Sequence, residues 1–322
     1  MKRNKIIIVI GLILAGAALL VILEGVNFPE NTYLLKSIKN AGHIPLFGLM
    51  SLVVLGMSFA LLNKKLPSRI WHYAVAFVVT GFLGFLSELF QKFTPRDADF
   101  WDIMRDIAGA AIFLLVWMTL DSKLRDYLKR WGKWAKPAVI LLAAFVIMIV
   151  SIYPILQWGV SYKQRSENLP VLCSFENNRD ASFVGSCRSQ ISMDKTPNEW
   201  TANTDSMAGR WEVNAGDWPQ VYFEPYPDWT GYDSLAFDTY SNEDTSLTAI
   251  VRIADFTRDG AEFDRKVVIP PGQADLSIPI ADIKKESRKR PLDISDIRII
   301  LIIFEKTTAP FTLYIDNLRL IK

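Results

Sequence analysis

Long uncharged apolar runs are the feature that most restricts how this chain can fold. Residues 6–23 form such a run of 18 residues, directly after the basic start MKRNK. A helix needs about 20 apolar residues to cross a bilayer, so this run is close to the required length. Signal peptides usually have a shorter apolar core and a small-residue cleavage site, and we therefore expect a retained membrane span.

Four further segments have the composition of membrane helices. One of them begins with Asp102, Arg105 and Asp106, and it is long enough only if its first turns carry these charges. We therefore predict an α-helical polytopic membrane domain of about five transmembrane helices over residues 1–160. The predicted spans are about 6–23, 44–62, 70–90, 102–120 and 137–156.

The charge of the chain changes after the last of these runs. Residues 1–162 contain 17 Lys and Arg against 9 Asp and Glu, whereas the remainder contains 19 against 25. The basic residues of the first part gather in MKRNK, 63–69 and 121–136, the alternate connections. Because cytoplasmic loops carry the excess of Lys and Arg, the N-terminus is expected in the cytoplasm and the C-terminal part outside it.

The only two cysteines, Cys173 and Cys187, lie early in the acidic part. Spacing alone leaves two alternatives, a disulfide or two buried free thiols. An external location would allow oxidation, so the predicted topology favours a disulfide between them.

The acidic part has the pattern of an all-β domain. SLTAIVRI (246–253) and ADLSIPI (274–280) alternate apolar and polar residues, and turn signals such as RDG and PPGQ separate the short strands. These features predict a linker at 161–169 and a β-sandwich at 170–322. The basic tract 284–290 lies in this acidic domain and is interpreted as a solvated loop, so no nucleic acid partner is expected.

Three stretches of this domain, FEN (175–177), DWTGYDSLAFDTYS (228–241) and LYIDNLRL (313–320), resemble galactose-binding-like jelly rolls of carbohydrate-binding modules. The resemblance implies a jelly-roll sandwich with a structural Ca²⁺ held by Glu176 and Asp316. Oxygen ligands of this kind suit Ca²⁺, although two carboxylates at strand edges are also common without a metal.

Sugar binding requires exposed aromatic rings with polar groups beside them. Trp211 and Trp229 lie next to strand-like segments and are expected in the core. The candidates for carbohydrate contact are Trp200, Trp218 and Tyr222.

A group of polar residues recurs at one predicted end of the membrane helices. Asp99, Asp102 and Asp106 fall on one face of a helix, and capping explains one or two of them. Asp106 lies a turn deeper, and ionisable groups at membrane depth are by default functional. We predict that six residues converge on one outward-facing polar site: His43, Glu88, Gln91, Arg96, Asp102 and Asp106.

HIPLFG (43–48), SELFQKFTPR (87–96) and DFWDIMRDIAG (99–109) resemble the VanZ-like membrane proteins. The resemblance covers about residues 30–120 and matches His43, Glu88, Gln91, Arg96, Asp102 and Gly109. Asp106 departs from the family's usual Asn, and a carboxylate cannot donate a hydrogen bond unless it is protonated. The resemblance implies a protein of the bacterial inner (cytoplasmic) membrane, linked to resistance against the glycopeptide teicoplanin.

Two function classes follow. The first is a non-enzymatic envelope protein that binds a lipid or cell-wall glycan headgroup. The second is a membrane enzyme that acts on a lipid-linked sugar or phosphate, with Asp102 or Glu88 as acid or base. The chain has no GxSxG, HExxH or P-loop motif, and a transport role has little support because repeats and broken-helix signals are missing from the sequence.

Overall fold

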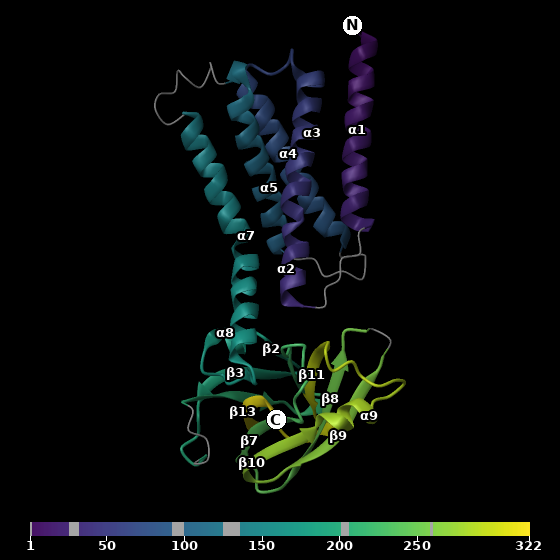
Figure 1. Cartoon of the computed structure of the whole chain (residues 1–322). Helices are drawn as coiled ribbons and strands as arrows, with labels where there is room; N and C mark the ends of the chain where they lie inside the picture. The colour runs from purple at the N-terminus through teal and green to yellow at the C-terminus, as the bar shows by residue number, and fades with distance from the viewer. Residues whose placement is uncertain (1, 26–31, 92–99, 125–135, 201–205, 258–259) are drawn as a thin grey trace. The chain divides into compact units, whose positions relative to one another are not determined.

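The computed structural model describes residues 2–25, 32–91, 100–124, 136–200, 206–257 and 260–322 (Figure 1). The chain divides into two compact units, a helical N-terminal unit that ends at Trp158 and a β unit that continues from Gly159. The predicted order, helices followed by a β-sandwich, is confirmed. Each unit is described by itself below.

The helices follow the apolar runs of the sequence. They are α1 (Lys2–Gly25), α2 (Tyr33–Ala41), α3 (His43–Leu62), α4 (Arg69–Gln91), α5 (Phe100–Leu120) and α7 (Pro137–Asn168). Among the described residues, four helical segments are long and apolar enough to cross a membrane: Tyr33–Leu62, Arg69–Phe90, Phe100–Leu120 and Pro137–Asn168. In α1 the apolar stretch Ile6–Leu19 is shorter, so the count of five spans stays a prediction.

Helices α3, α4 and α5 pack together, and α1 packs on α3. Glycines allow the closest approaches, because a side chain at these positions would meet a neighbouring helix. A Cβ at Gly109 in α5 would lie 2.2 Å from the carbonyl oxygen of Ile44 in α3. The outer surface remains apolar, with Phe82, Trp101 and Val150 more than half exposed. Such an exterior is compatible with insertion into a membrane.

The β unit consists of two antiparallel sheets and a two-stranded ribbon. Sheet A has the order β10-β7-β13-β4-β3, and β1 also pairs with β13; sheet B has the order β2-β6-β11-β8-β9; β12 pairs with β5. The strands are β1 (Val171–Cys173), β2 (Val184–Cys187), β3 (Ser189–Lys195), β4 (Met207–Val213), β5 (Gly216–Asp217), β6 (Gln220–Phe223), β7 (Ser234–Ser241), β8 (Leu247–Asp255), β9 (Glu262–Ile269), β10 (Gly272–Pro279), β11 (Ile297–Ile303), β12 (Lys306–Thr307) and β13 (Phe311–Ile321). Two short helices, α8 (Asn178–Ala181) and α9 (Ile280–Lys285), complete the unit.

The core of the sandwich contains apolar side chains from both sheets. Phe237 of sheet A and Val251 and Ile300 of sheet B are fully buried in one cluster. Trp211 and Trp229 belong to the same cluster, as expected from their positions beside strands. The alternation of apolar and polar residues therefore marks strands that turn one face toward the core, as predicted.

The predicted linker 161–169 is mostly helical, because α7 continues to Asn168. Its residues SYKQRSEN include several good helix formers, which extend the helix beyond the apolar run. The X-Pro bond Leu169–Pro170 is cis and leads directly into β1.

The prediction of a disulfide is wrong, because both cysteines are free thiols in the structure. Cys173 is buried in β1, which pairs with β13 in sheet A. Cys187 is exposed at the end of β2, which belongs to sheet B. The 13 residues between them include a helical turn and a change of sheet, which the spacing could not reveal.

Candidate functional site

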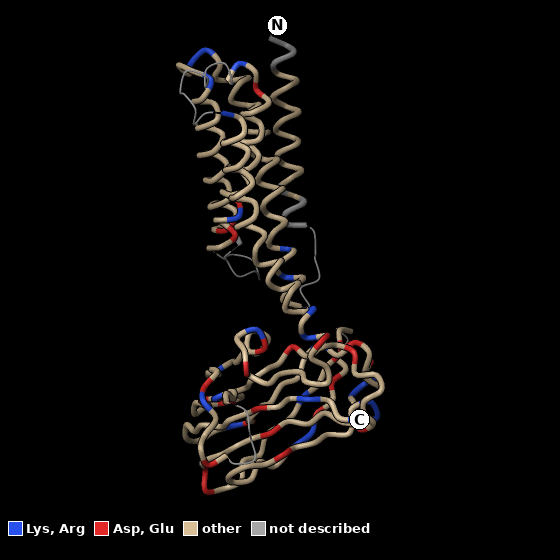
Figure 2. Tube along the Cα trace, turned by 60° about the vertical axis from the view of Figure 1, so that its left-hand side comes forward, with Lys and Arg blue, Asp and Glu red and all other residues tan. Residues whose placement is uncertain are grey.

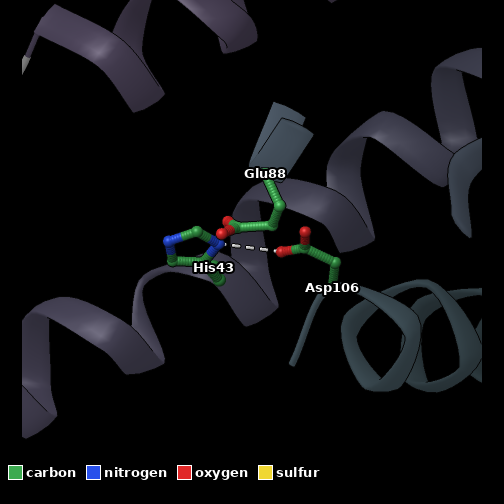
Figure 3. Close-up of side chains that lie close together, drawn as sticks. All are labelled: His43, Glu88 and Asp106. Atoms are coloured by element: carbon green, nitrogen blue, oxygen red, sulfur yellow. Dashed lines mark hydrogen bonds and ion pairs between the residues drawn. The ribbon is translucent and has the colours of Figure 1, made fainter. Parts of the chain in front are cut away.

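Three helices bring three ionisable side chains together in the helical unit. His43 is the first residue of α3, Glu88 lies in the last turn of α4, and Asp106 lies in the second turn of α5. Figure 3 shows that these side chains point toward one another from their separate helices. We call this group, His43, Glu88 and Asp106, the polar triad.

The triad is compact and withdrawn from solvent. The Nδ1 atom of His43 lies 2.8 Å from Oδ1 of Asp106, which is hydrogen-bond distance (Figure 3). One ligand-type atom from each of the three side chains lies within 4.8 Å of the others. Asp106 is fully buried, and Glu88 and His43 are 3% and 8% exposed. Burial of this kind strengthens every electrostatic interaction in the group.

One oxygen of Asp106 has no hydrogen-bond partner in the part of the chain that the structure describes. This atom, Oδ2, is buried. It lies on the side of α4, since a Cβ built on Gly84 would be only 2.7 Å away from it. Gly84 is one helical turn before Glu88, on the same face of α4. The missing side chain of Gly84 therefore leaves room for the carboxylate of Asp106.

Asp102 and Arg105 stand beside the triad on α5. The Arg105 guanidinium donates to Oδ1 of Asp102, and this pair is mostly buried. The other carboxylate oxygen of Asp102 lies 3.9 Å from Nε2 of His43. The two ring nitrogens of His43 thus face two different carboxylates. This arrangement fixes the orientation of the imidazole.

Of the six residues predicted for the polar site, the structure brings four together: His43, Glu88, Asp102 and Asp106. Arg96 and the side chain of Gln91 lie outside the described residues. Sequence reasoning missed Gly84, whose only signal was its position four residues before Glu88.

A second polar group was not predicted and lies at the other end of the same helices. Asp121 accepts hydrogen bonds from Nε of Arg69 at 2.5 Å and from the Tyr73 hydroxyl at 2.8 Å. His72 is buried and lies 2.8 Å from the hydroxyl of Ser58. The signal in the sequence was Arg69 at the start of one apolar run and Asp121 at the end of the next run.

The carbohydrate candidates of the β unit differ from one another in the structure. Trp200 is only 3% exposed and stacks on Tyr240 with 5.9 Å between ring centroids, so its prediction as an exposed platform is wrong. The reason is that a loop residue can fold its ring back onto the outer face of a sheet. Trp218 is 49% exposed, and Tyr222 is half-buried in β6.

The predicted calcium ligands have other partners. Glu176 is exposed, and its carboxylate accepts hydrogen bonds from the Met207 amide and the Ser206 hydroxyl. The amide of Met207 holds the pKa of Glu176 below its usual value. Asp316 is fully buried and accepts a hydrogen bond from the Asn317 amide. In the described residues, the group whose ligand atoms could surround a metal is the polar triad, so calcium at Glu176 and Asp316 stays a prediction.

Comparisons with known proteins show neither a matching protein family nor a matching curated protein. Solved structures do match. A family 11 carbohydrate-binding module from Clostridium thermocellum, in complex with a β-1,3-1,4-mixed-linked tetrasaccharide, is similar over 47% of this chain and 94% of its own, with 13% identity and a TM-score of 0.37.

Two further structures match to the same degree. An exo-β-agarase is 18% identical over 47% of this chain and 25% of its own, with a TM-score of 0.39. A carbohydrate-binding module specific for non-crystalline cellulose is 14% identical over 48% of this chain and 94% of its own, with a TM-score of 0.36. The chain thus corresponds to only a quarter of the agarase.

Proposed function

We propose that this chain is a membrane protein of the bacterial cell envelope whose helical unit binds the polar headgroup of a lipid or of a lipid-linked glycan precursor. The observation that carries the proposal is the polar triad, three buried ionisable side chains contributed by three different apolar helices. Ionisable groups inside a membrane bundle destabilise it unless they are paired, and they mark functional sites.

A purely structural role explains only part of this arrangement. Asp102 in the first turn of α5 is favoured there by the helix dipole. The hydrogen bond between His43 and Asp106 would stabilise contact between α3 and α5. Neither effect requires the carboxylate of Glu88 on α4 to be buried in the same place. A polar ligand that contacts all three helices would account for it.

The distribution of basic residues supports an outward direction for the triad. Helix α3 begins at His43, and the turn after its other end contains Lys64 and Lys65. Figure 2 shows Lys and Arg at that end of the helical unit, and others on α2 and α5 at the opposite end. By the positive-inside rule that end faces the cytoplasm, and the triad then faces the cell wall. The β unit, joined to the last span, is external in this arrangement.

The VanZ-like resemblance of residues 43–48, 87–96 and 99–109 supports the same proposal, because His43, Glu88 and Asp102 lie in the matched stretches. It extends the proposal to resistance against teicoplanin.

The test is a binding measurement on the full chain in detergent. Lipids with phosphate and pyrophosphate–sugar headgroups are titrated into the wild type, His43→Gln and His72→Gln. These two histidines are the only ones in the sequence, and both are buried. His72 contacts Ser58 of α3, which lies about 22 Å along the helix from His43. We expect His43→Gln to weaken binding at least tenfold and His72→Gln to leave it unchanged. Equal effects of both variants would contradict the proposal.

The same samples test the enzyme alternative. Because the carboxylates of Glu88 and Asp106 lie close to an imidazole, proton transfer to a bound headgroup is chemically feasible. Release of phosphate or sugar from the titrated lipids by the wild type, and loss of this release in Glu88→Gln, would support the enzyme alternative.

For the β unit we propose contact with cell-wall glycan through Trp218. Its ring is 49% exposed, and the preceding residue, Asp217, accepts a hydrogen bond from Arg188 through its carbonyl oxygen. An exposed aromatic ring with polar groups nearby in the chain suits a sugar ring with its hydroxyl groups. Glycan binding by the full chain should be lost in Trp218→Ala and retained in Trp200→Phe. A result with no difference between these variants would remove Trp218 as the contact.

A further inference from the structure

We propose that His43, Glu88 and Asp106 form a binding site for a divalent transition-metal ion, with Zn²⁺ or Mn²⁺ as the ion that its ligands fit. The site uses the residues of the proposed headgroup site, but it does not depend on the headgroup. Metal binding by the triad is a separate property that can be measured without any lipid.

The donor set is the first argument. One imidazole nitrogen and two carboxylates are ligands that Zn²⁺ and Mn²⁺ accept, at metal–ligand distances of about 2.0–2.2 Å. Ligands at such distances lie roughly 3.4 Å from one another around a tetrahedral ion. In the triad the candidate atoms already lie within 4.8 Å of one another, on three separate helices. Small rotations of the side chains would bring them to a common ion.

The unpartnered oxygen of Asp106 is the second, independent argument. Asp106 is fully buried, its Oδ1 contacts His43, and its Oδ2 has no hydrogen-bond partner among the described residues. A buried polar atom without a partner is costly, and a bound ion is one of the ordinary ways to satisfy it. A cation at the triad would satisfy this carboxylate.

The surroundings of His43 are the third argument. If Nδ1 binds the ion on the side of Asp106, Nε2 carries the proton and faces Oδ2 of Asp102 at 3.9 Å. Histidines that bind metals usually direct their second ring nitrogen to a carboxylate, which fixes the tautomer and the ring orientation. Arg105 holds Asp102 in place from the other side. Asp102 is thus a positioning residue and not a ligand.

Three protein ligands leave at least one coordination position open. That position could accept water or an oxygen of a phosphate-containing headgroup. The site therefore differs from closed structural zinc sites, in which protein side chains occupy every position.

The test uses the full chain in detergent, purified with a histidine-free affinity tag and treated with a chelator. Zn²⁺, Mn²⁺ and Mg²⁺ are titrated by calorimetry, and bound metal is counted by elemental mass spectrometry. We expect one Zn²⁺ or Mn²⁺ per chain, and Mg²⁺ at least tenfold weaker because it prefers oxygen ligands and retains its waters. Glu88→Gln and Asp106→Asn should each weaken binding at least tenfold, and Asp102→Asn by about 10–100-fold.

His72→Gln is the matched control, since it changes the other buried imidazole and should bind metal like the wild type. Co²⁺ provides a spectroscopic readout: its visible absorption should report nitrogen and oxygen ligands in the wild type and change in His43→Gln. Where a variant does not fold, as judged by helical circular dichroism and gel filtration, the wild-type stoichiometry and Co²⁺ spectrum decide. Wild type without uptake of Zn²⁺ or Mn²⁺, or uptake unchanged by Asp106→Asn, would overturn the site. Because no lipid is present, either result leaves the headgroup proposal standing.

Discussion

His43 and Asp106 are 63 residues apart in the chain, and yet Nδ1 of the one lies 2.8 Å from Oδ1 of the other. The contact depends on the close packing of α3, α4 and α5. Gly84 on α4 makes room for the Asp106 carboxylate, and Gly109 on α5 allows α3 to approach. The site can therefore be tested through residues that carry no charge.

Gly84→Ala should disturb the triad without removing any titratable group. The added methyl would lie 2.7 Å from Oδ2 of Asp106, so the carboxylate must move. We expect headgroup or metal affinity to fall by about tenfold, corresponding to about 1.4 kcal/mol. Gly81→Ala on the same helix is the control, because its methyl would meet Ile107 at an ordinary 3.7 Å. Calorimetry on both variants measures the difference, and equal affinities would show that the position of the carboxylate is unimportant.

Gly109→Ala should destabilise the helical unit. Its methyl would lie 2.2 Å from the carbonyl oxygen of Ile44, a backbone atom that cannot rotate away. Forced separation of packed elements typically destabilises by about 1–3 kcal/mol. Thermal unfolding in detergent should show a clearly lower midpoint. Gly11→Ala is the control, because its methyl would meet nothing within 4 Å, and its midpoint should equal or slightly exceed that of the wild type. Equal midpoints for Gly109→Ala and Gly11→Ala would refute the close contact.

Asp255→Asn should strongly destabilise the β-sandwich. Asp255 is 2% exposed and forms two hydrogen bonds with the Arg290 guanidinium, at 2.6 and 2.9 Å. The Arg290 side chain is 29% exposed, so the pair is partly buried, and removal of one charge should destabilise the domain by about 1–3 kcal/mol. Glu305→Gln is the control, because its pair with Lys266 is exposed and such pairs contribute only about 0–1 kcal/mol. Urea unfolding followed by tryptophan fluorescence compares the two variants. Similar midpoints would show that the Asp255–Arg290 pair contributes no more than the exposed pair.

The same carboxylate predicts sensitivity to acid. Burial alone would raise the pKa of Asp255, but hydrogen bonds from Arg290 and from the amides of Asp293 and Thr257 hold it below the ordinary 3.8. The folded-state pKa is thus lower than the unfolded one. The stability that it contributes is present above pH 3.8 and is lost as the pH falls through the folded-state pKa. Unfolding midpoints measured from pH 6 downward should fall less in Asp255→Asn than in the wild type.

Glu224 predicts the opposite dependence. Burial raises the pKa of its carboxyl group from 4.5 to about 7. The folded-state pKa is the higher one, so the contribution to stability is complete below pH 4.5 and is lost as the pH rises through about 7. Glu224→Gln, which stays neutral, should therefore gain stability over the wild type at pH 8, by on the order of 1–3 kcal/mol. At pH 4.5 the two proteins should unfold together; a constant difference at all pH values would show that Glu224 does not titrate in this range.

The two cysteines should differ in reactivity. Cys173 is buried, which raises the pKa of its thiol, whereas Cys187 is exposed. Alkylation of the native protein without reductant should add one label, at Cys187, and alkylation after unfolding should add two. Mass spectrometry of the intact chain counts the labels. No label in either state would mean that the disulfide forms after all.

The helical part and the β part could be predicted from the sequence, because apolar runs and alternating strands are local patterns that burial imposes on neighbouring residues. The sequence also placed Trp211 and Trp229 in the core. His43, Glu88 and Asp106 could be named as one site because each lies near the end of an apolar run at the same predicted surface.

Features that depend on packing between distant segments could not be predicted from local patterns. Trp200 turned out to be covered, because its ring stacks on Tyr240 from another strand. Cys173 and Cys187 separated because a change of sheet lies between them. The part played by Gly84 is visible only where α4 meets α5, since the space left by a missing side chain has meaning only beside the neighbour that fills it.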